Sequence, residues 1–326
     1  GDRKKTPQII EKIAELMKHE TAGDPISGLK WTRKTPKKIA EHLKSLNITV
    51  SRRTVARLLK DMRYSLRVNR KKLESGNRNP PTPEARNQQF EYISEQREAF
   101  ESRGCPIASV DTKKKELIGK FKNNGVSWEQ EPPLVNDHDF RSDATGIAVP
   151  YGVYDPMANF GFVGLGTSFE TPAFVVDVIE LWWKLYGYNM YPGAKEVLLL
   201  ADCGGGNGYR ARAFKYRLQY QLCNLYGLSV TVCHYPPGAS KWNPIEHRLF
   251  SEISKNWAGK PLETYETASK YIRSTKTDGG LHVRCRQVAR QYEKGETISV
   301  EEMETLRLTH HDTLPDWNYT LKPGKI

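Results

Sequence analysis

Three acidic residues stand where secondary-structure elements are expected to begin or end. Asp111 ends the apolar stretch PIASVD, Asp202 ends the stretch KEVLLLAD, and Glu246 follows the loop YPPGASKWNPI. Ligands of α/β sheets usually bind at the carboxyl ends of strands. The two aspartates therefore converge if their strands are neighbours in one sheet, and a helix arriving beside them would add Glu246.

Carboxylates gathered in this way have a definite chemical use. They repel one another, so they are hard to keep ionised together without a cation. Mg²⁺ prefers oxygen ligands and keeps waters and substrate phosphates in its shell, and Mn²⁺ accepts the same ligands. Two such ions about 3.5–4 Å apart activate a water or a 3′-hydroxyl and stabilise the leaving oxygen of a phosphodiester. The three acids therefore predict Mg²⁺-dependent phosphodiester chemistry, with Mn²⁺ as a substitute.

Each acid also has a structural interpretation, and spacing alone leaves both open. Asp is common in turns such as the one expected after Asp111, and Asp202 precedes three glycines that could begin a turn. Glu246 lies three residues after Asn243, with Pro244 between them. This is the spacing of a capping box, in which the Glu carboxylate accepts a hydrogen bond from the backbone N–H of the cap residue.

The glycine-rich segment DCGGGNG, residues 202–208, suggests a different class of enzyme. It resembles the cofactor loop of methyltransferases that use S-adenosylmethionine, but Tyr209 breaks the G-x-G-x-x-G pattern. That class also expects an acidic residue after the next strand, which here ends at Cys233-His234-Tyr235. The segment therefore favours the carboxylate site over a cofactor loop.

The elements around the acids predict an α/β fold with a mixed sheet. Two strands joined by a tight turn at 112–114 come first, and helices and strands then alternate, which is typical of a mixed sheet with helices on its faces. The expected strands are residues 106–111, 115–121, 146–154, 160–167, 195–202 and 228–235. The expected helices are residues 171–187, residues 208–225 and a helix after Asn243.

The N-terminal region is basic, and we expect it to be all-α. Residues 1–100 hold 23 Lys+Arg against 12 Asp+Glu, a net charge of +11, whereas the remainder carries +1. Helices are expected over residues 6–20, from Thr35-Pro36 onward, and after Ser51, with residues 21–34 as a loop. The third helix presents Arg52, Arg53, Arg57 and Lys60 on its outer face. This pattern favours a helix-turn-helix that binds double-stranded DNA, and the alternative is a helical bundle with a charged surface.

Composition narrows the class of protein further. The 326 residues are 38% hydrophobic and 27% charged, which suits a globular chain with a core. No apolar run reaches the ~18 residues of a membrane span, so no membrane partner is expected. The odd number of cysteines, without paired CxxC motifs, argues against a disulfide framework or a structural zinc site. We therefore expect a protein of a reduced, cytoplasmic compartment.

Several long segments resemble a known family. VDTKKKELIGKFKNNG, the HDF of residues 138–140, VPYGVYD, ADCGGGNGYR and HYPPGASKWNPIEHRLFSEISKNWAG resemble the DDE transposases of bacterial insertion sequences, of the ISAzo or Rhodopirellula type. The NPIEH segment is also similar to the third-acid motif of the wider mariner-like superfamily. The resemblance covers residues 28–310, including the helix-turn-helix entry at WTRKTPKKIA.

The resemblance implies an RNase H-like fold in which Asp111, Asp202 and Glu246 are the catalytic, metal-binding acids. It implies Mg²⁺-dependent hydrolysis at the ends of the element, followed by attack of the freed 3′-hydroxyl on target DNA. Synapsis of two ends implies self-association to at least a dimer. Lys241 and Arg248, which flank Glu246, are further candidate phosphate contacts.

These expectations give a domain plan and leave two rivals. We expect a helix-turn-helix domain at residues 1–72, a linker and connecting helix at 73–103, a catalytic domain at 104–310 and a C-terminal tail at 311–326. One rival is a sequence-specific DNA-binding regulator whose carboxylates are structural. The other is a nuclease that cuts DNA strands without joining them.

Overall fold

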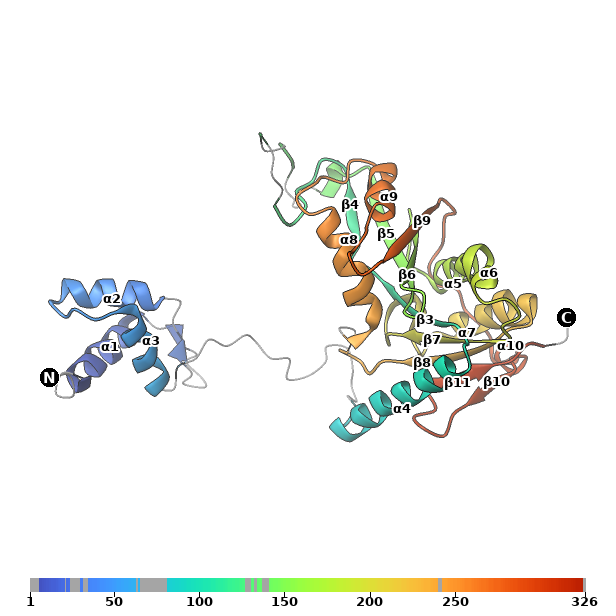
Figure 1. Cartoon of the computed structure of the whole chain (residues 1–326), viewed down its shortest axis with the longest axis horizontal. Helices are drawn as coiled ribbons and strands as arrows, with labels where there is room; N and C mark the ends of the chain where they lie inside the picture. The colour runs from blue at the N-terminus through green and yellow to red at the C-terminus, as the bar shows by residue number, and fades with distance from the viewer. Residues whose placement is uncertain are drawn as a thin grey trace. The chain divides into compact units, whose positions relative to one another are not determined.

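The computed structural model describes residues 6–20, 22–23, 30–31, 35–62, 64, 81–126, 130–131, 134–136, 141–239 and 242–324. The chain divides into two compact units, Gly1–Lys72 and Leu73–Ile326 (Figure 1). Among the residues named above, Lys241, the HDF segment at 138–140 and residues 73–80 of the expected linker lie outside the described residues.

The small unit contains the three helices that the sequence predicts. They are α1 (Thr6–Glu20), α2 (Pro36–Ser45) and α3 (Arg52–Asp61). Thr35 Oγ1 accepts a hydrogen bond from Lys38 N at 3.3 Å, and Ser51 Oγ accepts one from Thr54 N at 3.1 Å, so both helices begin at side-chain caps. The helices enclose a small core of Ile13, Ile39, Leu43, Val55 and Leu58.

The small unit also holds a short antiparallel ladder that the sequence does not predict. β1 (Ala22–Gly23) pairs with β2 (Lys30–Trp31) inside the segment expected as a loop. Strands of two residues carry no detectable alternation of apolar and polar side chains. The described part of the unit is therefore helical with one short ladder, and not purely α-helical.

The described part of the larger unit is built on a nine-stranded mixed sheet (Figure 1). Its strands are β3 (Ile107–Thr112), β4 (Glu116–Ile118), β5 (Gly146–Asp155), β6 (Phe160–Gly166), β7 (Glu196–Ala201), β8 (Ser229–His234), β9 (His282–Val288), β10 (Leu308–His310) and β11 (Asn318–Leu321). β3, β5 and β6 are antiparallel neighbours, whereas β7 and β8 run parallel to β3. The strand order β6-β5-β3-β7-β8 is RNase H-like, and the predicted mixed α/β fold is confirmed.

Helices cover both faces of this sheet. They are α4 (Pro83–Ser102), α5 (Pro172–Trp182), α6 (Tyr188–Met190), α7 (Arg212–Leu218), α8 (Ser251–Asn256), α9 (Tyr265–Arg273) and α10 (Val300–Glu304). Three π-helical segments, Trp183–Gly187, Gln219–Asn224 and Glu246–Phe250, adjoin α5, α7 and α8. None of the described helices is both long and apolar enough to cross a bilayer.

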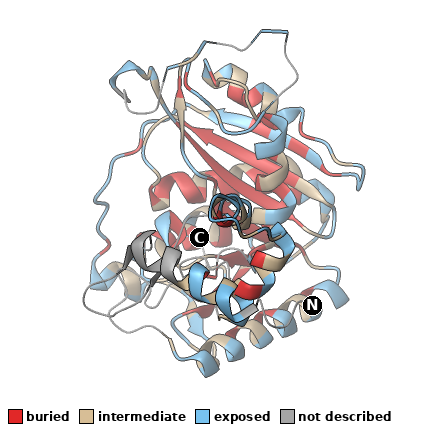
Figure 2. Ribbon diagram, turned by 90° about the vertical axis from the view of Figure 1, so that its left-hand side faces the viewer, coloured by how far each residue is buried: buried red, intermediate tan, exposed pale blue. Residues whose placement is uncertain are grey.

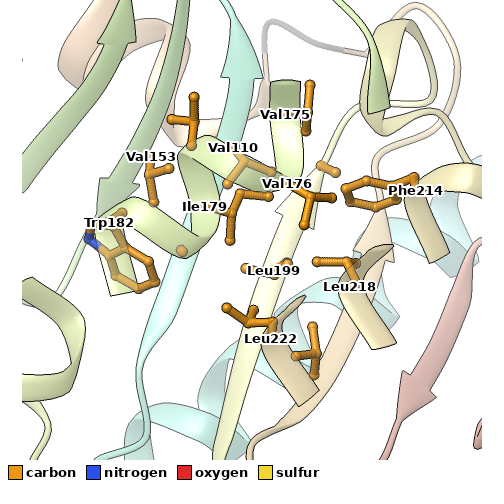
Figure 3. Packing of buried hydrophobic residues seen from close by; sticks show 14 of the residues in the cluster. Val110, Val153, Val175, Val176, Ile179, Trp182, Leu199, Phe214, Leu218 and Leu222 are labelled. Carbon is orange, nitrogen blue, oxygen red and sulfur yellow. The ribbon is translucent and has the colours of Figure 1, made fainter. Parts of the chain in front are cut away.

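The core lies between the sheet and these helices, and Figure 2 shows the central strands of the sheet in the red of buried residues. On one face, Val110, Val153 and Leu199 of the strands pack against α5 and α7 (Figure 3). Alternate residues of the same strands face the opposite side, because successive side chains of a strand point to opposite faces. There Tyr154 packs among residues of α8 and α9, while Leu198 packs with residues of α4.

The structure corrects the expected pairing of the first two strands. The sequence predicts β3 and β4 as neighbours joined by a tight turn, but both pair with β5 instead. The ten residues of β5 are long enough to pair with β3 at Tyr151–Tyr154 and with β4 at Gly146–Ala148. A turn between two strands therefore did not imply a hairpin.

Two further boundaries differ from the expectation. Helix α7 begins at Arg212 and not at residue 208, because the glycine-rich segment forms a short 3₁₀ turn over Gly205–Asn207. Residues 311–326, expected as a tail, contain β11, which pairs with β8 through Asn318–Cys233 and Tyr319–Val232. β11 has only four residues, which is too short to give a clear pattern in the sequence.

Candidate active site

The topology brings Asp111 and Asp202 to the same edge of the sheet. β3 and β7 are parallel neighbours, and their register places Val110 opposite Ala201. Asp111 and Asp202 are the next residue of each chain segment. Ligands of α/β sheets bind at such carboxyl ends, so the convergence expected from the two apolar runs is present.

Each aspartate is oriented by a hydrogen bond. Asp111 Oδ1 accepts from the backbone N–H of Thr112 at 2.7 Å, and Asp202 Oδ1 accepts from Asn207 Nδ2 at 2.9 Å. The Asn207 side chain is buried, and Asn207 is itself the last residue of the glycine-rich turn. The three glycines after Asp202 thus lead into a turn that returns an amide to this carboxylate.

His234, at the end of β8, supports the backbone of Asp202. Its Nδ1 lies 2.8 Å from the carbonyl oxygen of Asp202, and a carbonyl can only accept, so Nδ1 carries the proton. Burial lowers the pKa of His234 to about 4, which keeps the ring neutral. His234 is therefore a buried structural histidine, the role that is common for a histidine at such a position.

Glu246 is brought to the aspartates by a buried link between two distant segments. The Asn243 amide accepts a hydrogen bond from Ser109 Oγ and donates one to the Val110 carbonyl at 3.1 Å. Ser109 Oγ in turn accepts from the backbone N–H of Ile245 at 3.0 Å. Because Ser109 lies on β3 two residues before Asp111, the start of the Glu246 segment is fixed to the strand that carries Asp111.

This link resolves the capping interpretation of Asn243 and Glu246. The Asn243 amide forms its hydrogen bonds with Ser109 and Val110 of β3, and no side chain caps the π-helical segment Glu246–Phe250. A true capping box occurs elsewhere in the described chain, between Ser299 and Glu302. The backbone N–H of Glu246 bonds to the Asn243 carbonyl at 3.1 Å, so Asn243 and Pro244 still begin the helical segment. π-Helical turns are frequent at functional sites.

Gly152 permits the close approach of that segment to the sheet. It lies on β5 directly opposite Asp111. A Cβ atom at this position would stand 2.6 Å from Phe250 Cε1 and 2.8 Å from Ile245 Cδ1. Any larger residue would therefore press on the helical turn that carries Glu246.

Burial disfavours the charged form of all three acids. Burial, followed by the charge of Asp202, raises the pKa of Asp111. Burial also raises the pKa of Asp202, against the hydrogen bond from Asn207, and the charge of Glu246 adds to the rise. Burial raises the pKa of Glu246 as well, while Lys113 and a hydrogen bond with the Asp111 carboxyl act in the opposite direction. The three carboxyl groups thus influence one another's protonation.

Two hollows open beside these acids. One, of about 440 Å³, is lined by Asp111 and Asp202, together with Glu170 and the glycine turn. The other, of about 580 Å³, is lined by Glu246 and by the polar side chains of Asn123, Asn124, His247, Ser251 and Ser254. Lys113 and Lys114 line both hollows, so the hollows lie on either side of these two lysines.

The donor set fits a hard divalent cation. Carboxylate oxygens are the ligands that Mg²⁺ and Mn²⁺ prefer, and the raised pKa values mark charge that such a cation would neutralise. Among the described residues, no group of three or more His, Cys, Asp or Glu side chains is placed so that all could hold one ion. An ion at the two aspartates would therefore complete its shell with waters and substrate oxygens, as Mg²⁺ commonly does.

The remaining predicted site residues lie elsewhere. Arg52, Arg53, Arg57 and Lys60 are all exposed on α3 of the small unit. Arg248 is exposed but lines neither hollow, and it lies near Tyr154, whose pKa its charge lowers against the effect of burial. Lys241 is outside the described residues.

Sequence reasoning missed three charged residues at the site. Glu170, which precedes α5, lines the aspartate hollow, and Lys113 and Lys114 line both hollows. The run of three lysines after Thr112 was the available signal for the lysines. Glu170 carried no local signal, because only the packing of α5 brings it to the edge of the sheet.

The strand order of the sheet, and the two acids at the carboxyl ends of the parallel neighbours β3 and β7, place the larger unit in the RNase H-like class. The family model described as Rhodopirellula transposase DDE domain matches residues 12–323, and the chain belongs to that family. No curated protein sequence matches the chain significantly.

Solved structures of the Mos1 transposase show a distant likeness. The paired-end complex with the left transposon end has 15% identity, covers 81% of this chain and 69% of that chain, and gives a TM-score of 0.43. The Mos1 Strand Transfer Complex has 18% identity, 83% and 72% coverage and a TM-score of 0.44. The Mos1 mariner paired end complex with Mn has 14% identity, 81% and 68% coverage and a TM-score of 0.43. These likenesses are weak, and the identification stands on the family match.

Proposed function

We propose that the chain is a DDE transposase that binds the terminal inverted repeats of a DNA transposon and catalyses metal-dependent strand cleavage and strand transfer. The observation that carries this proposal is the convergence of three acids from distant segments. β3 and β7 bring Asp111 and Asp202 together, and the link between Ser109 and Asn243 brings Glu246 to them. Membership of a transposase family agrees with this arrangement.

The acids are proposed to hold one or two divalent ions, Mg²⁺ or Mn²⁺. When bound, such ions activate the attacking hydroxyl and stabilise the charge that develops on the phosphodiester. The chain itself orients the ligands: the Thr112 N–H holds Asp111, the Asn207 amide holds Asp202, and Asn243 holds the turn that carries Glu246. A purely structural role for the acids is disfavoured, because their mutual repulsion costs stability when no cation is present.

The small unit is proposed to recognise the DNA ends. Its exposed α3 carries Arg52, Arg53, Arg57 and Lys60, and a recognition helix of this kind lies in the major groove. Asn47 has a φ of 61°, and Asn tolerates this conformation, which permits the short connection between α2 and α3. Residues 1–72 would thus bind the ends, and residues 104–310 would cut and join them, with at least two copies holding the two ends.

A strand-transfer assay tests the proposal. Binding sites are first selected by the full chain from a pool of random-sequence DNA, and pre-cleaved duplexes carrying them are incubated with a supercoiled target plasmid and Mg²⁺. We expect joined products with the unmodified chain and none with Glu246→Gln, while both bind the selected duplex equally. Cleavage of uncut sites without joining would indicate a nuclease instead. Neither cleavage nor joining, with binding retained, would indicate a DNA-binding regulator.

A further inference from the structure

Three consecutive lysines, Lys113, Lys114 and Lys115, follow the strand that carries Asp111, and they have different surroundings. Lys113 and Lys114 line both hollows of the site, whereas Lys115 lines only the aspartate hollow. Because the three side chains are of one type, any difference between their roles must come from their contacts.

Lys113 is an internal counter-ion. It is buried, and its Nζ lies 3.5 Å from Glu116 Oε1 and 4.6 Å from the ring centroid of Trp257. Its charge also lowers the pKa of Glu246, against the effect of burial. A lysine held in this way by a carboxylate and an aromatic face has little freedom to reach a ligand.

Lys115 forms an ion pair with Glu170. Its Nζ lies 2.9 Å from Glu170 Oε2. Glu170 is itself held, since its Oε1 accepts from the backbone N–H of Gly206 at 3.3 Å. The charge of Lys115 is therefore engaged with a carboxylate that belongs to the wall of the aspartate hollow.

Lys114 differs from both neighbours. It is exposed, and it makes no hydrogen bond, ion pair or ring contact with any residue that the structure describes. Its backbone is nevertheless well fixed. The Lys113 N–H bonds to the Pro150 carbonyl at 2.9 Å, and the side chains on either side of Lys114 are both anchored. Lys114 therefore presents an unpaired cation from a rigid point where the two hollows meet.

We propose that Lys114 binds a backbone phosphate of the DNA strand that passes between the aspartate hollow and the Glu246 hollow. The ligand is a phosphodiester, which an ammonium group contacts without reading the sequence. The fixed loop lowers the conformational entropy lost on binding, because only the lysine side chain must be ordered. This assignment rests on the proposed action of the chain on DNA.

Salt dependence of DNA binding tests the contact. The background is the full chain with Asp111→Asn, Asp202→Asn and Glu246→Gln, which prevents cleavage and removes the repulsion between the acids and DNA in metal-free buffer. Affinity for a fluorescein-labelled random-sequence duplex is measured by anisotropy over a range of NaCl concentrations. Each lost contact to a duplex phosphate lowers the slope of log K against log[salt] by about 0.9 in magnitude.

We expect Lys114→Gln to show this reduction and Lys114→Arg to restore the slope. Lys115→Gln is the matched control, since its ammonium is already paired, and it should leave the slope unchanged. Thermal unfolding of each variant confirms that the fold is retained, as expected for exposed positions. An unchanged slope in Lys114→Gln, or an equal reduction in Lys115→Gln, would overturn the assignment.

Cleavage of a plasmid that carries the selected binding sites, by the unmodified chain with Mg²⁺, separates this inference from the proposed function. A chain that does not cleave, but whose DNA binding shows the slope change at Lys114, would refute the transposase activity and leave the phosphate contact in place. A chain that cleaves while the slope is independent of Lys114 would refute the contact alone.

Discussion

Ser109 on β3 and Asn243 before the Glu246 turn are hydrogen-bonded side chain to side chain, although 134 residues separate them in the sequence. Both are fully buried. Asp111 lies two residues beyond Ser109, and Glu246 lies three residues beyond Asn243. The pair thus sets the position of one acid relative to another, and it has no contact with solvent.

Replacing Asn243 should therefore impair the site beyond its effect on stability. Asn243→Ala leaves buried partners unsatisfied, which costs about 1–3 kcal/mol. It removes two of the three hydrogen bonds described between the Glu246 turn and β3, and only the bond from the Ile245 N–H to Ser109 Oγ is left. Loss of such supporting contacts typically reduces metal affinity or activity about 10- to 100-fold. We expect a loss of this size in Mn²⁺ affinity, measured by calorimetry, and in plasmid cleavage.

A second buried amide provides the control for Asn243. Asn318 exchanges hydrogen bonds of 2.7 and 2.8 Å with Gln89, which ties β11 to α4. Asn318→Ala should cost a similar free energy of unfolding and leave Mn²⁺ affinity unchanged. Equal losses of Mn²⁺ affinity in the two variants would show that Asn243 acts only through general stability.

A methyl group at Gly152 should displace Glu246 without touching it. In Gly152→Ala the new Cβ collides with Ile245 and Phe250, and such overpacking costs about 1–3 kcal/mol. The collision pushes on the turn that carries Glu246, so plasmid cleavage should fall more steeply than stability. A variant with reduced stability but full cleavage activity would contradict this account of Gly152.

The acids should make metal-free stability depend on pH in a defined direction. The pKa values of Asp111 and Asp202 are raised on folding, chiefly by burial, above the value of ~3.9 for an unfolded Asp. Between about pH 4 and these raised pKa values, the folded chain therefore binds more protons than the unfolded chain, and its free energy of unfolding falls as pH rises. Mg²⁺ must displace these protons, so its stabilising effect should grow with pH.

Thermal unfolding with and without Mg²⁺ at several pH values measures this effect. Asp111→Asn is the matched control: without metal it should be more stable than the unmodified chain at neutral pH, by on the order of 1 kcal/mol. It should also show a weaker dependence on pH and a smaller response to Mg²⁺. A stabilisation by Mg²⁺ that is constant or declines with rising pH would show that Mg²⁺ does not compete with protons at Asp111 and Asp202.

The basic face of α3 should dominate recognition of the ends. Arg53 and Arg57 are exposed there, and neutralising both should weaken binding of the selected duplex. The slope of log K against log[salt] should fall in magnitude by the amount expected for about two phosphate contacts. Lys37 on α2 is the control, because its Nζ lies 3.9 Å from Glu41 Oε1 and its positive charge is partly balanced by that carboxylate. Anisotropy titrations compare the double variant Arg53→Gln/Arg57→Gln with Lys37→Gln. Equal losses of affinity and of salt dependence in the two would show that α3 has no special role.

The sequence was most informative where local signals define an element. The apolar run before Asp202 predicts a buried strand, and the cap patterns at Thr35 and Ser51 predict helices that the structure contains. The convergence of Asp111 and Asp202 could be anticipated, because it needs only that two such strands be parallel neighbours. These features depend on few residues that are close in sequence.

Other features depended on contacts that sequence does not show. The amide of Asn243 could bond to its own helix or to another strand, and only the packing of the turn against β3 decides between them. Glu170 reaches the site through the packing of α5, and the short strand β11 exists through its pairing with β8. In each case a distant partner determines the role of a residue whose local pattern is ambiguous.

The central claim is that the site formed by Asp111, Asp202 and Glu246 holds one or two divalent ions. Calorimetric titration of Mn²⁺ into the metal-free full chain and into Asp111→Asn, Asp202→Asn and Glu246→Gln tests it most directly. We predict saturable binding to the unmodified chain that is lost or greatly weakened in each of the three variants, while their thermal unfolding shows that the fold is intact. Equal Mn²⁺ binding by the unmodified chain and all three variants would contradict the claim.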